Sequence, residues 1–139
     1  MIQIIAGEKG KGKTKILLDK ANAEVLTTTG TLAFIDKNNR HMYELNNKVR
    51  LINIKDYFVN DAKEFAGFIA GIISQDNDLA KVYLDGFLSI APMENSDISD
   101  MMKKLETLSN AFNVDFVISI SKNKEDFPED VKPFITVAL

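Results

Sequence analysis

The fold is decided by the first fourteen residues, MIQIIAGEKGKGKT (Met1–Thr14). The apolar run 2–6 predicts a short buried strand, and apolar residues at helical spacing beyond Thr14 predict a helix over about 13–26. Between them lie three glycines, which tolerate positive φ and let the backbone curl so that successive N–H groups point inward. The helix start adds its partial positive charge at the same place. This stretch therefore predicts a strand, an anion-binding loop and a helix, in that order.

The loop itself reads G-x-x-x-x-G-K-T, which is the P-loop or Walker A pattern. The mechanics of that pattern assign the loop backbone to phosphate, Lys13 to the β- and γ-phosphates, and the Thr14 hydroxyl to Mg²⁺. We therefore expect a Mg²⁺–nucleotide ligand, with ATP ahead of GTP. The predicted nucleotide-binding residues are Gly7, Glu8, Lys9, Gly10, Lys11, Gly12, Lys13 and Thr14.

Length and composition narrow the class of protein. A chain of 139 residues predicts one domain spanning 1–139. The net charge of −3 argues against a surface that coats nucleic acid, and the absence of cysteine excludes disulfides and thiolate metal sites. No apolar run approaches the ~20 residues that span a bilayer, and the N-terminus lacks the charged start of a signal peptide. These features predict a cytoplasmic protein.

Strand and helix patterns alternate along the chain. Buried or half-buried strands are predicted at 2–6, 32–36, 49–54, 82–85, 116–120 and 134–137, the third with the alternation of an edge strand. Amphipathic helices are predicted from Phe58 to Ile73, with Phe58 among the packing residues, and from Ile98 to Phe112, with Asn95 or Ser96 as N-cap. This alternation predicts a three-layer α/β/α sandwich around a mainly parallel sheet. With the Walker A pattern after its first strand, the predicted architecture resembles the P-loop NTPase fold.

A second phosphate-related pattern is Val82-Tyr83-Leu84-Asp85, an apolar strand that ends in an acid. It resembles a Walker B segment, whose aspartate holds Mg²⁺ opposite the P-loop hydroxyl. Mg²⁺ bound with phosphates needs only one or two protein oxygens, so Thr14 and Asp85 form a sufficient metal set. The alternative is that Asp85 only starts a turn.

With both patterns in place, the chain resembles the RecA-like, additional-strand branch of P-loop NTPases, as a minimal single-domain member. The resemblance implies a glutamate that activates water, either after the Walker B aspartate or at the end of the second strand. Gly86 stands at the first position and Lys37-Asn38-Asn39 follows the second strand. The predicted catalytic residues are Lys13, which reaches the phosphates, and Asp36, which could replace the missing glutamate as base. The alternative for Asp36 is that it only starts a turn.

The same resemblance places a polar γ-phosphate sensor near the end of a later strand, where Ser119 and Ser121 lie. Simple turn chemistry is the alternative for both serines. Without the glutamate, nucleotide binding is better supported than hydrolysis. We expect hydrolysis to be weak or to depend on a protein partner or on homo-oligomerisation.

Three other functions remain open. Asn123-Lys124-Glu125-Asp126 fits N-K-x-D, the guanine-reading motif of small GTPases, although the companion D-x-x-G is missing. A non-hydrolysing nucleotide sensor or assembly module fits the same P-loop. A small-molecule kinase normally clamps phosphates with several arginines, and this chain has only Arg40 and Arg50, either of which could act as an arginine finger.

Overall fold

Six parallel strands form one sheet in the computed structural model, which describes residues 1–139. In chain order the elements are β1 (Ile2–Gly7), α1 (Lys13–Glu24), β2 (Thr31–Asp36), β3 (Arg50–Asn53), η1 (Ile54–Tyr57), α2 (Ala62–Gln75), β4 (Leu79–Leu84), α3 (Phe87–Ile90), α4 (Ser99–Phe112), β5 (Asp115–Ser121), η2 (Lys124–Asp126), η3 (Lys132–Phe134) and β6 (Ile135–Ala138). The strand order is β3-β2-β4-β5-β1-β6. The predicted α/β fold with a parallel sheet is therefore confirmed.

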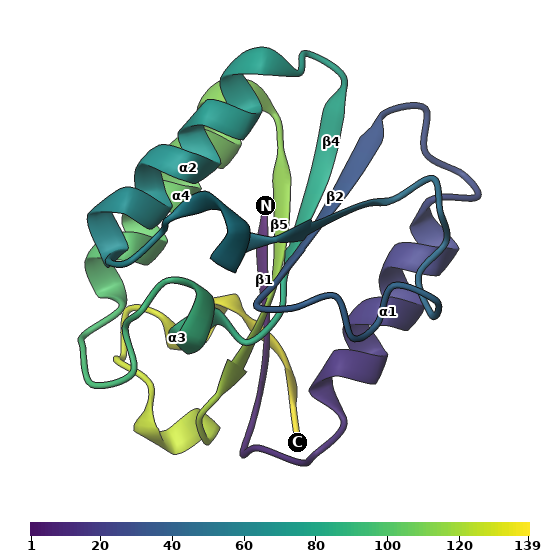
Figure 1. Ribbon diagram of the computed structural model, residues 1–139. Helices are drawn as coiled ribbons and strands as arrows, with labels where there is room; N and C mark the ends of the chain where they lie inside the picture. The colour runs from purple at the N-terminus through teal and green to yellow at the C-terminus, as the bar shows by residue number, and fades with distance from the viewer.

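Helices cover both faces of this sheet. Figure 1 views the molecule from the β3 edge, with α1 on one side of the sheet and α2, α3 and α4 on the other. Parallel strands need crossover connections, and those connections put helices on the two faces. Because all strands run the same way, their carboxyl ends meet at one edge of the sheet, where the loop between β1 and α1 also lies.

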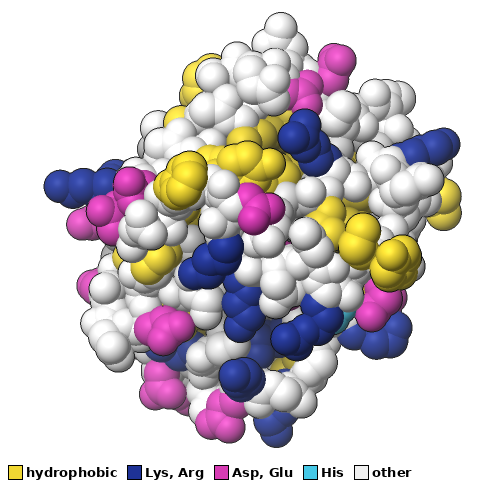
Figure 2. Space-filling view, in the orientation of Figure 1, with side chains coloured by type: hydrophobic (Ala, Val, Ile, Leu, Met, Phe, Trp, Pro, Cys, Tyr) yellow, Lys and Arg dark blue, Asp and Glu magenta, His cyan; other side chains and the backbone are white.

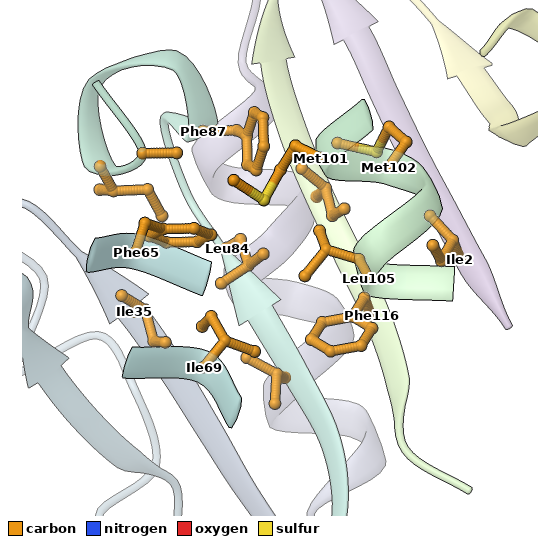
Figure 3. Close-up of a cluster of buried hydrophobic side chains, with 14 of the residues drawn as sticks. Ile2, Ile35, Phe65, Ile69, Leu84, Phe87, Met101, Met102, Leu105 and Phe116 are labelled. Carbon is orange, nitrogen blue, oxygen red and sulfur yellow. The ribbon is translucent and has the colours of Figure 1, made fainter. Parts of the chain in front are cut away.

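The core has one apolar cluster on each face, because side chains alternate along buried strands. Ile4, Ile35 and Leu84 belong to the larger cluster, whereas Ile5 and Tyr83 belong to the smaller one under α1. Figure 3 shows the larger cluster, in which side chains from α2 and α4 converge on β4 and β5. Burial of both faces explains why these strands read as nearly continuous apolar runs.

The helix expected from Phe58 begins later than predicted. Phe58 follows η1 with φ 62° and is 83% exposed, so its assignment to the packed face of a helix was wrong. The helix α2 starts at Ala62 because the Asp61 carboxylate accepts a hydrogen bond from Glu64 N at 2.8 Å, while Glu64 Oε1 accepts one from Asn60 N at 2.8 Å. This pair of bonds resembles a capping box and ends the non-helical segment.

The expected cap of the last long helix was also misplaced. The helix α4 begins at Ser99, and Ile98 occupies the N-cap position without a side-chain cap. Neither Asn95 nor Ser96 caps the helix; instead Asp97 Oδ1 accepts a hydrogen bond from Ser99 N at 2.9 Å. The expected edge strand is confirmed, since β3 pairs only with β2. No helix in the structure has the length and apolar character needed to cross a membrane.

Candidate functional site

The loop between β1 and α1 takes the shape that its glycines allow. Gly10 and Gly12 adopt φ values of 87° and 89°, in the left-handed region where a side chain would be strained. Gly12 occupies the N-cap position of α1, which starts at Lys13. The first turn of a helix leaves N–H groups without intrahelical partners, so hydrogen-bond donors remain available where the loop meets α1.

Lys13 extends across this loop. Its side chain is buried, and its Nζ donates a hydrogen bond to the backbone oxygen of Glu8 at 2.9 Å. Burial lowers the pKa of Lys13, and the nearby negative charge of Asp85 partly offsets that effect. The ammonium group therefore lies inside the curve of the loop, facing an acid from another strand.

Thr14 and Asp85 are in direct contact. Thr14 Oγ1 donates to the Asp85 carboxylate, 2.9 Å from Oδ2 and 3.2 Å from Oδ1. On the other side, Ser119 Oγ donates to Asp85 Oδ1 at 2.7 Å and accepts a hydrogen bond from Gly86 N at 2.8 Å. Ser119 is 1% exposed. Two hydroxyl groups therefore fix the position of the Asp85 carboxylate.

Strand order explains why these groups meet. The strand β5 lies between β4 and β1, and Ile118 is the register partner of both Leu84 and Ile4. Asp85 and Ser119 each come one residue after that row. They consequently reach the carboxyl edge of the sheet side by side, next to the loop that follows β1.

Asp36 lies at the same edge, at the end of β2, and is 4% exposed. Its Oδ1 accepts a hydrogen bond from Lys37 N at 2.7 Å. Next to it, Asp85 N donates a hydrogen bond to the backbone oxygen of Ile35 at 3.0 Å, which extends the pairing of β2 with β4. Burial is the main cause that raises the pKa of Asp36. The hydrogen bond from Lys37 opposes the rise, and the neighbouring Asp85 charge adds to it. Asp36 is therefore a carboxylate that holds its proton more tightly than an ordinary aspartate.

A polar cavity of about 250 Å³ joins these groups. Figure 2 shows basic side chains gathered over the end of the molecule where the β1–α1 loop and the connection after β2 lie. Lysine and arginine on both sides of a cavity create a positive potential that attracts a multiply charged anion. The lining residues are Lys9, Gly10, Gly12, Lys13, Thr14, Asp36, Lys37, Asn38, Arg40, His41, Asp85, Gly86, Ser119 and Ser121.

Some predicted residues lie elsewhere. Gly7, Glu8 and Lys11 belong to the loop but do not line the cavity, and Arg50 lines a different cleft. In the N-K-x-D segment, Asn123 Nδ2 donates to Glu8 Oε1 at 2.9 Å, which ties this segment to the loop. Asp126, the residue that would read guanine, is exposed on η2 and is not part of the cavity lining.

Sequence reasoning missed the basic residues of the connection after β2. Lys37, Arg40 and His41 line the cavity, whereas the only role expected in this stretch was that of an arginine finger at Arg40. Their position directly after a buried parallel strand is a signal that was available. Connections after parallel strands lie at the ligand-binding edge of α/β sheets.

The chemistry of the donor set limits which metals fit. No group of three or more histidine, cysteine, aspartate or glutamate side chains converges anywhere in the structure. The Thr14 hydroxyl and one Asp85 carboxylate supply hard oxygen ligands in contact with each other. Such a set is too small to hold an ion alone but suits Mg²⁺ that arrives with phosphate oxygens.

Comparison with known proteins returned no match, either to a protein-family model or to a curated protein.

Proposed function

We propose that this chain binds a Mg²⁺–nucleoside triphosphate, ATP ahead of GTP, at the loop 7–14. The observation that carries the proposal is the contact between Thr14 and Asp85, 2.9 Å between Oγ1 and Oδ2, beside the buried ammonium of Lys13. Proteins that bind magnesium with a nucleotide's phosphates use the same parts: a glycine-rich loop, a lysine, a hydroxyl, and a carboxylate that follows another strand of the sheet.

The phosphate groups have identifiable partners in this cavity. Backbone N–H groups at the start of α1 and the ammonium of Lys13 would receive the phosphate oxygens. Lys9, Lys37 and Arg40 line the same cavity and would offset the remaining negative charge. A triphosphate carries more charge than the loop alone balances, so this surrounding set favours triphosphate over diphosphate.

The metal would be held by Thr14 and Asp85, with Ser119 and Gly86 N keeping the carboxylate in place. When bound, Mg²⁺ supplies charge neutralisation between phosphate oxygens. Ser119 acts by positioning Asp85, since it is buried and its hydroxyl is fully engaged between the carboxylate and the backbone.

The strand order supports assignment to the RecA-like, additional-strand branch. One strand, β5, lies between β1, which leads into the loop, and β4, which carries Asp85.

Hydrolysis by the isolated chain is expected to be slow. Gly86 follows Asp85 where related proteins would offer a glutamate, and Asp36 is the carboxylate at the end of the neighbouring strand. Phosphoryl transfer depends on positioning water and on compensating charge, and an arginine finger alone contributes about 10³–10⁵ in rate. We therefore expect Asp36 to act as the base of a weak or partner-dependent NTPase. A nucleotide sensor that does not hydrolyse is the alternative.

A GTPase-like protein is the second candidate, because the hydrogen bond from Asn123 to Glu8 joins the N-K-x-D segment to the loop. It ranks below the ATP proposal because Asp126 is exposed and lies outside the cavity lining. Base preference distinguishes the two candidates directly.

The test is calorimetric binding of ATP, GTP and their diphosphates, with and without Mg²⁺, followed by a phosphate-release assay. Lys13→Ala and Thr14→Ala should each weaken Mg²⁺–triphosphate binding about 10–100-fold, the loss expected for one charge-assisted contact. The matched control is Lys15→Ala, whose ammonium is exposed and paired with Asp19 at 3.3 Å. Circular dichroism checks folding. Unchanged triphosphate affinity in folded Lys13→Ala would refute the proposal.

A further inference from the structure

Exposed apolar side chains concentrate in one segment of this chain. Eight large hydrophobic residues are exposed, and four of them fall between residues 42 and 58, namely Met42, Tyr43, Tyr57 and Phe58. Figure 2, seen from the β3 edge, shows hydrophobic side chains gathered beside the same edge, above the basic end of the molecule. Large apolar side chains gathered on the surface of a folded domain indicate an interaction site.

A cleft of about 410 Å³ lies between the amino ends of β2 and β3 and the helix α2, and of the four exposed residues only Tyr57 lines it. Ala33 and Ile52 come from the two strands, and Phe68 and Ile72 come from α2. Tyr57 lies against Phe68, with ring centroids 5.6 Å apart. The helix α2 packs against the sheet through its own buried residues Phe65 and Ile69, toward the centre of the sheet. The edge strand is therefore left partly uncovered, which creates the cleft.

The charge around this cleft is basic. Lys48 and Arg50 line it, and neither forms an ion pair within the chain. The acid in the lining, Asp76, accepts hydrogen bonds from the Thr31 hydroxyl and from Asp78 N, the latter at 3.0 Å, and offsets one of the two positive charges, so the lining keeps a net positive charge. An occupant of this cleft therefore needs an apolar body next to an acidic group.

The chain itself presents such a group on the connection between β2 and β3. Tyr43 is 92% exposed and is followed by Glu44, whose side chain is also largely exposed and has one carboxylate oxygen, Oε2, 3.2 Å from His41 Nδ1. The other oxygen, Oε1, has no partner within the chain. Asn22 of α1 holds this segment: its Nδ2 donates to the Glu44 oxygen at 2.9 Å, and its Oδ1 accepts from Asn46 N at 2.8 Å. Because the backbone of this loop is already anchored, little further backbone freedom is lost on binding, which favours association.

We propose that two copies of this chain form a twofold dimer in which Tyr43 of each copy enters the cleft of the other and Glu44 meets Lys48 and Arg50. The connection 37–49 leads directly into β3, and both lie at the near edge of the sheet in Figure 1. The cleft begins at the junction of the two, because Lys48 and Arg50 line it. A twofold axis then forms both contacts at once. Tyrosine and arginine are the residue types that dominate such interfaces.

The test is the concentration dependence of mass, by sedimentation velocity and light scattering on the nucleotide-free protein. Wild type should form dimers. Tyr43→Ala and Arg50→Glu should each raise the dissociation constant at least about tenfold, because each change acts twice per dimer. Phe112→Ala, an exposed aromatic at the end of α4, is the matched control and should leave the dimer unchanged.

A charge exchange makes the test specific to the pairing. Glu44→Arg alone should weaken the dimer, and the double variant Glu44→Arg with Arg50→Glu should regain much of the lost affinity. Lys13→Ala should dimerise like wild type, so failure of the nucleotide proposal leaves this one standing. Three results would each overturn the dimer: wild type that stays monomeric at the highest attainable concentration, a dimer indifferent to Tyr43→Ala, or no recovery in the double variant. A monomer whose cleft binds the anionic dye anilinonaphthalene sulfonate would identify a small-ligand cleft instead.

Discussion

Thr14 donates a hydrogen bond to Asp85 across 71 residues of sequence, with Oγ1 2.9 Å from Oδ2. The hydroxyl comes from the first turn of α1 and the carboxylate from the residue after β4. Both oxygens belong to a cavity lined by four lysine or arginine side chains, Lys9, Lys13, Lys37 and Arg40. The contact is therefore the point where a metal ligand set and a phosphate-binding loop would meet, and it is the natural place to test the proposed function.

The first prediction concerns the carboxylate. Asp85→Asn should weaken nucleotide binding in the presence of Mg²⁺ by about tenfold or more, because it removes an anionic ligand. Binding without Mg²⁺ should change less or become tighter, since the repulsion between Asp85 and phosphate disappears. Titration calorimetry with and without EDTA gives both values. If the ratio of the two affinities does not move, Asp85 is only a turn residue.

The second prediction isolates the positioning residue. Ser119→Ala should lower the Mg²⁺-dependent affinity about 10–100-fold, the usual effect of losing a group that orients a metal ligand. It should leave the Mg²⁺-free affinity unchanged, which a general loss of structure would not do. Ser74→Ala is the control, because Ser74 bonds only within α2, to the Gly71 oxygen at 2.8 Å. Equal losses with and without Mg²⁺ would contradict the positioning role.

The third prediction separates the two roles of Asp36. Asp36→Asn should remove residual phosphate release while preserving nucleotide affinity, if this carboxylate is the base. The same change should raise the melting temperature at neutral pH. Burial raises the pKa of Asp36 above its ordinary 3.8, so the folded state holds the proton more tightly than the unfolded state. Stability therefore falls as the pH rises from 3.8 through the folded-state pKa, and ionised Asp36 is destabilising above that window.

The stabilising effect of Asp36→Asn should accordingly shrink as the pH is lowered toward 3.8. Asparagine keeps an oxygen that can accept the hydrogen bond from Lys37 N, so little else changes. Differential scanning calorimetry over a pH series measures the effect. A variant that melts below wild type at neutral pH would show that the Asp36 charge is compensated by groups around it.

The fourth prediction concerns Arg40. Arg40→Ala should reduce the preference for triphosphate over diphosphate, because Arg40 lines the cavity and the two ligands differ by one charged group. Arg40→Lys should recover only part of the effect, since lysine lacks the planar fork that pairs with two phosphate oxygens. Lys104→Ala, an exposed cation on α4, is the control. If the triphosphate-to-diphosphate affinity ratio is the same in Arg40→Ala and wild type, Arg40 is a surface residue without a role in binding.

The fifth prediction decides the base. Competition binding should show that ATP is preferred or tolerated, and Asp126→Ala should not alter the choice, because Asp126 is exposed on η2. A strong GTP preference that collapses in Asp126→Ala would favour the GTPase-like candidate. In that case Asn123→Ala, which breaks the bond to Glu8, should weaken GTP binding as well.

Features that depend only on neighbouring residues could be predicted from the sequence. The apolar run after Met1 makes β1, and Gly10 and Gly12 permit the left-handed turns that no larger residue adopts without strain. The alternation of buried strands with amphipathic helices predicted the parallel sheet, and the structure confirms it. Local periodicity was misleading at Phe58. The helical spacing of apolar residues extends back to Phe58, but the helix itself begins only after its N-cap residue, Asp61.

Tertiary structure decided which polar groups meet. Ser119 and Asp85 are separated by 34 residues, and their hydrogen bond depends on β5 lying next to β4, which no local pattern specifies. The placement of Arg40 in the cavity, and of Arg50 in the apolar cleft at the other end of the strands, has the same origin. Backbone conformation depends on neighbouring residues, so the sequence of Met1–Thr14 by itself determined the strand and the glycine turns of that segment. Contacts between strand ends follow from sheet order, and sheet order is fixed only when the two apolar clusters pack on its faces.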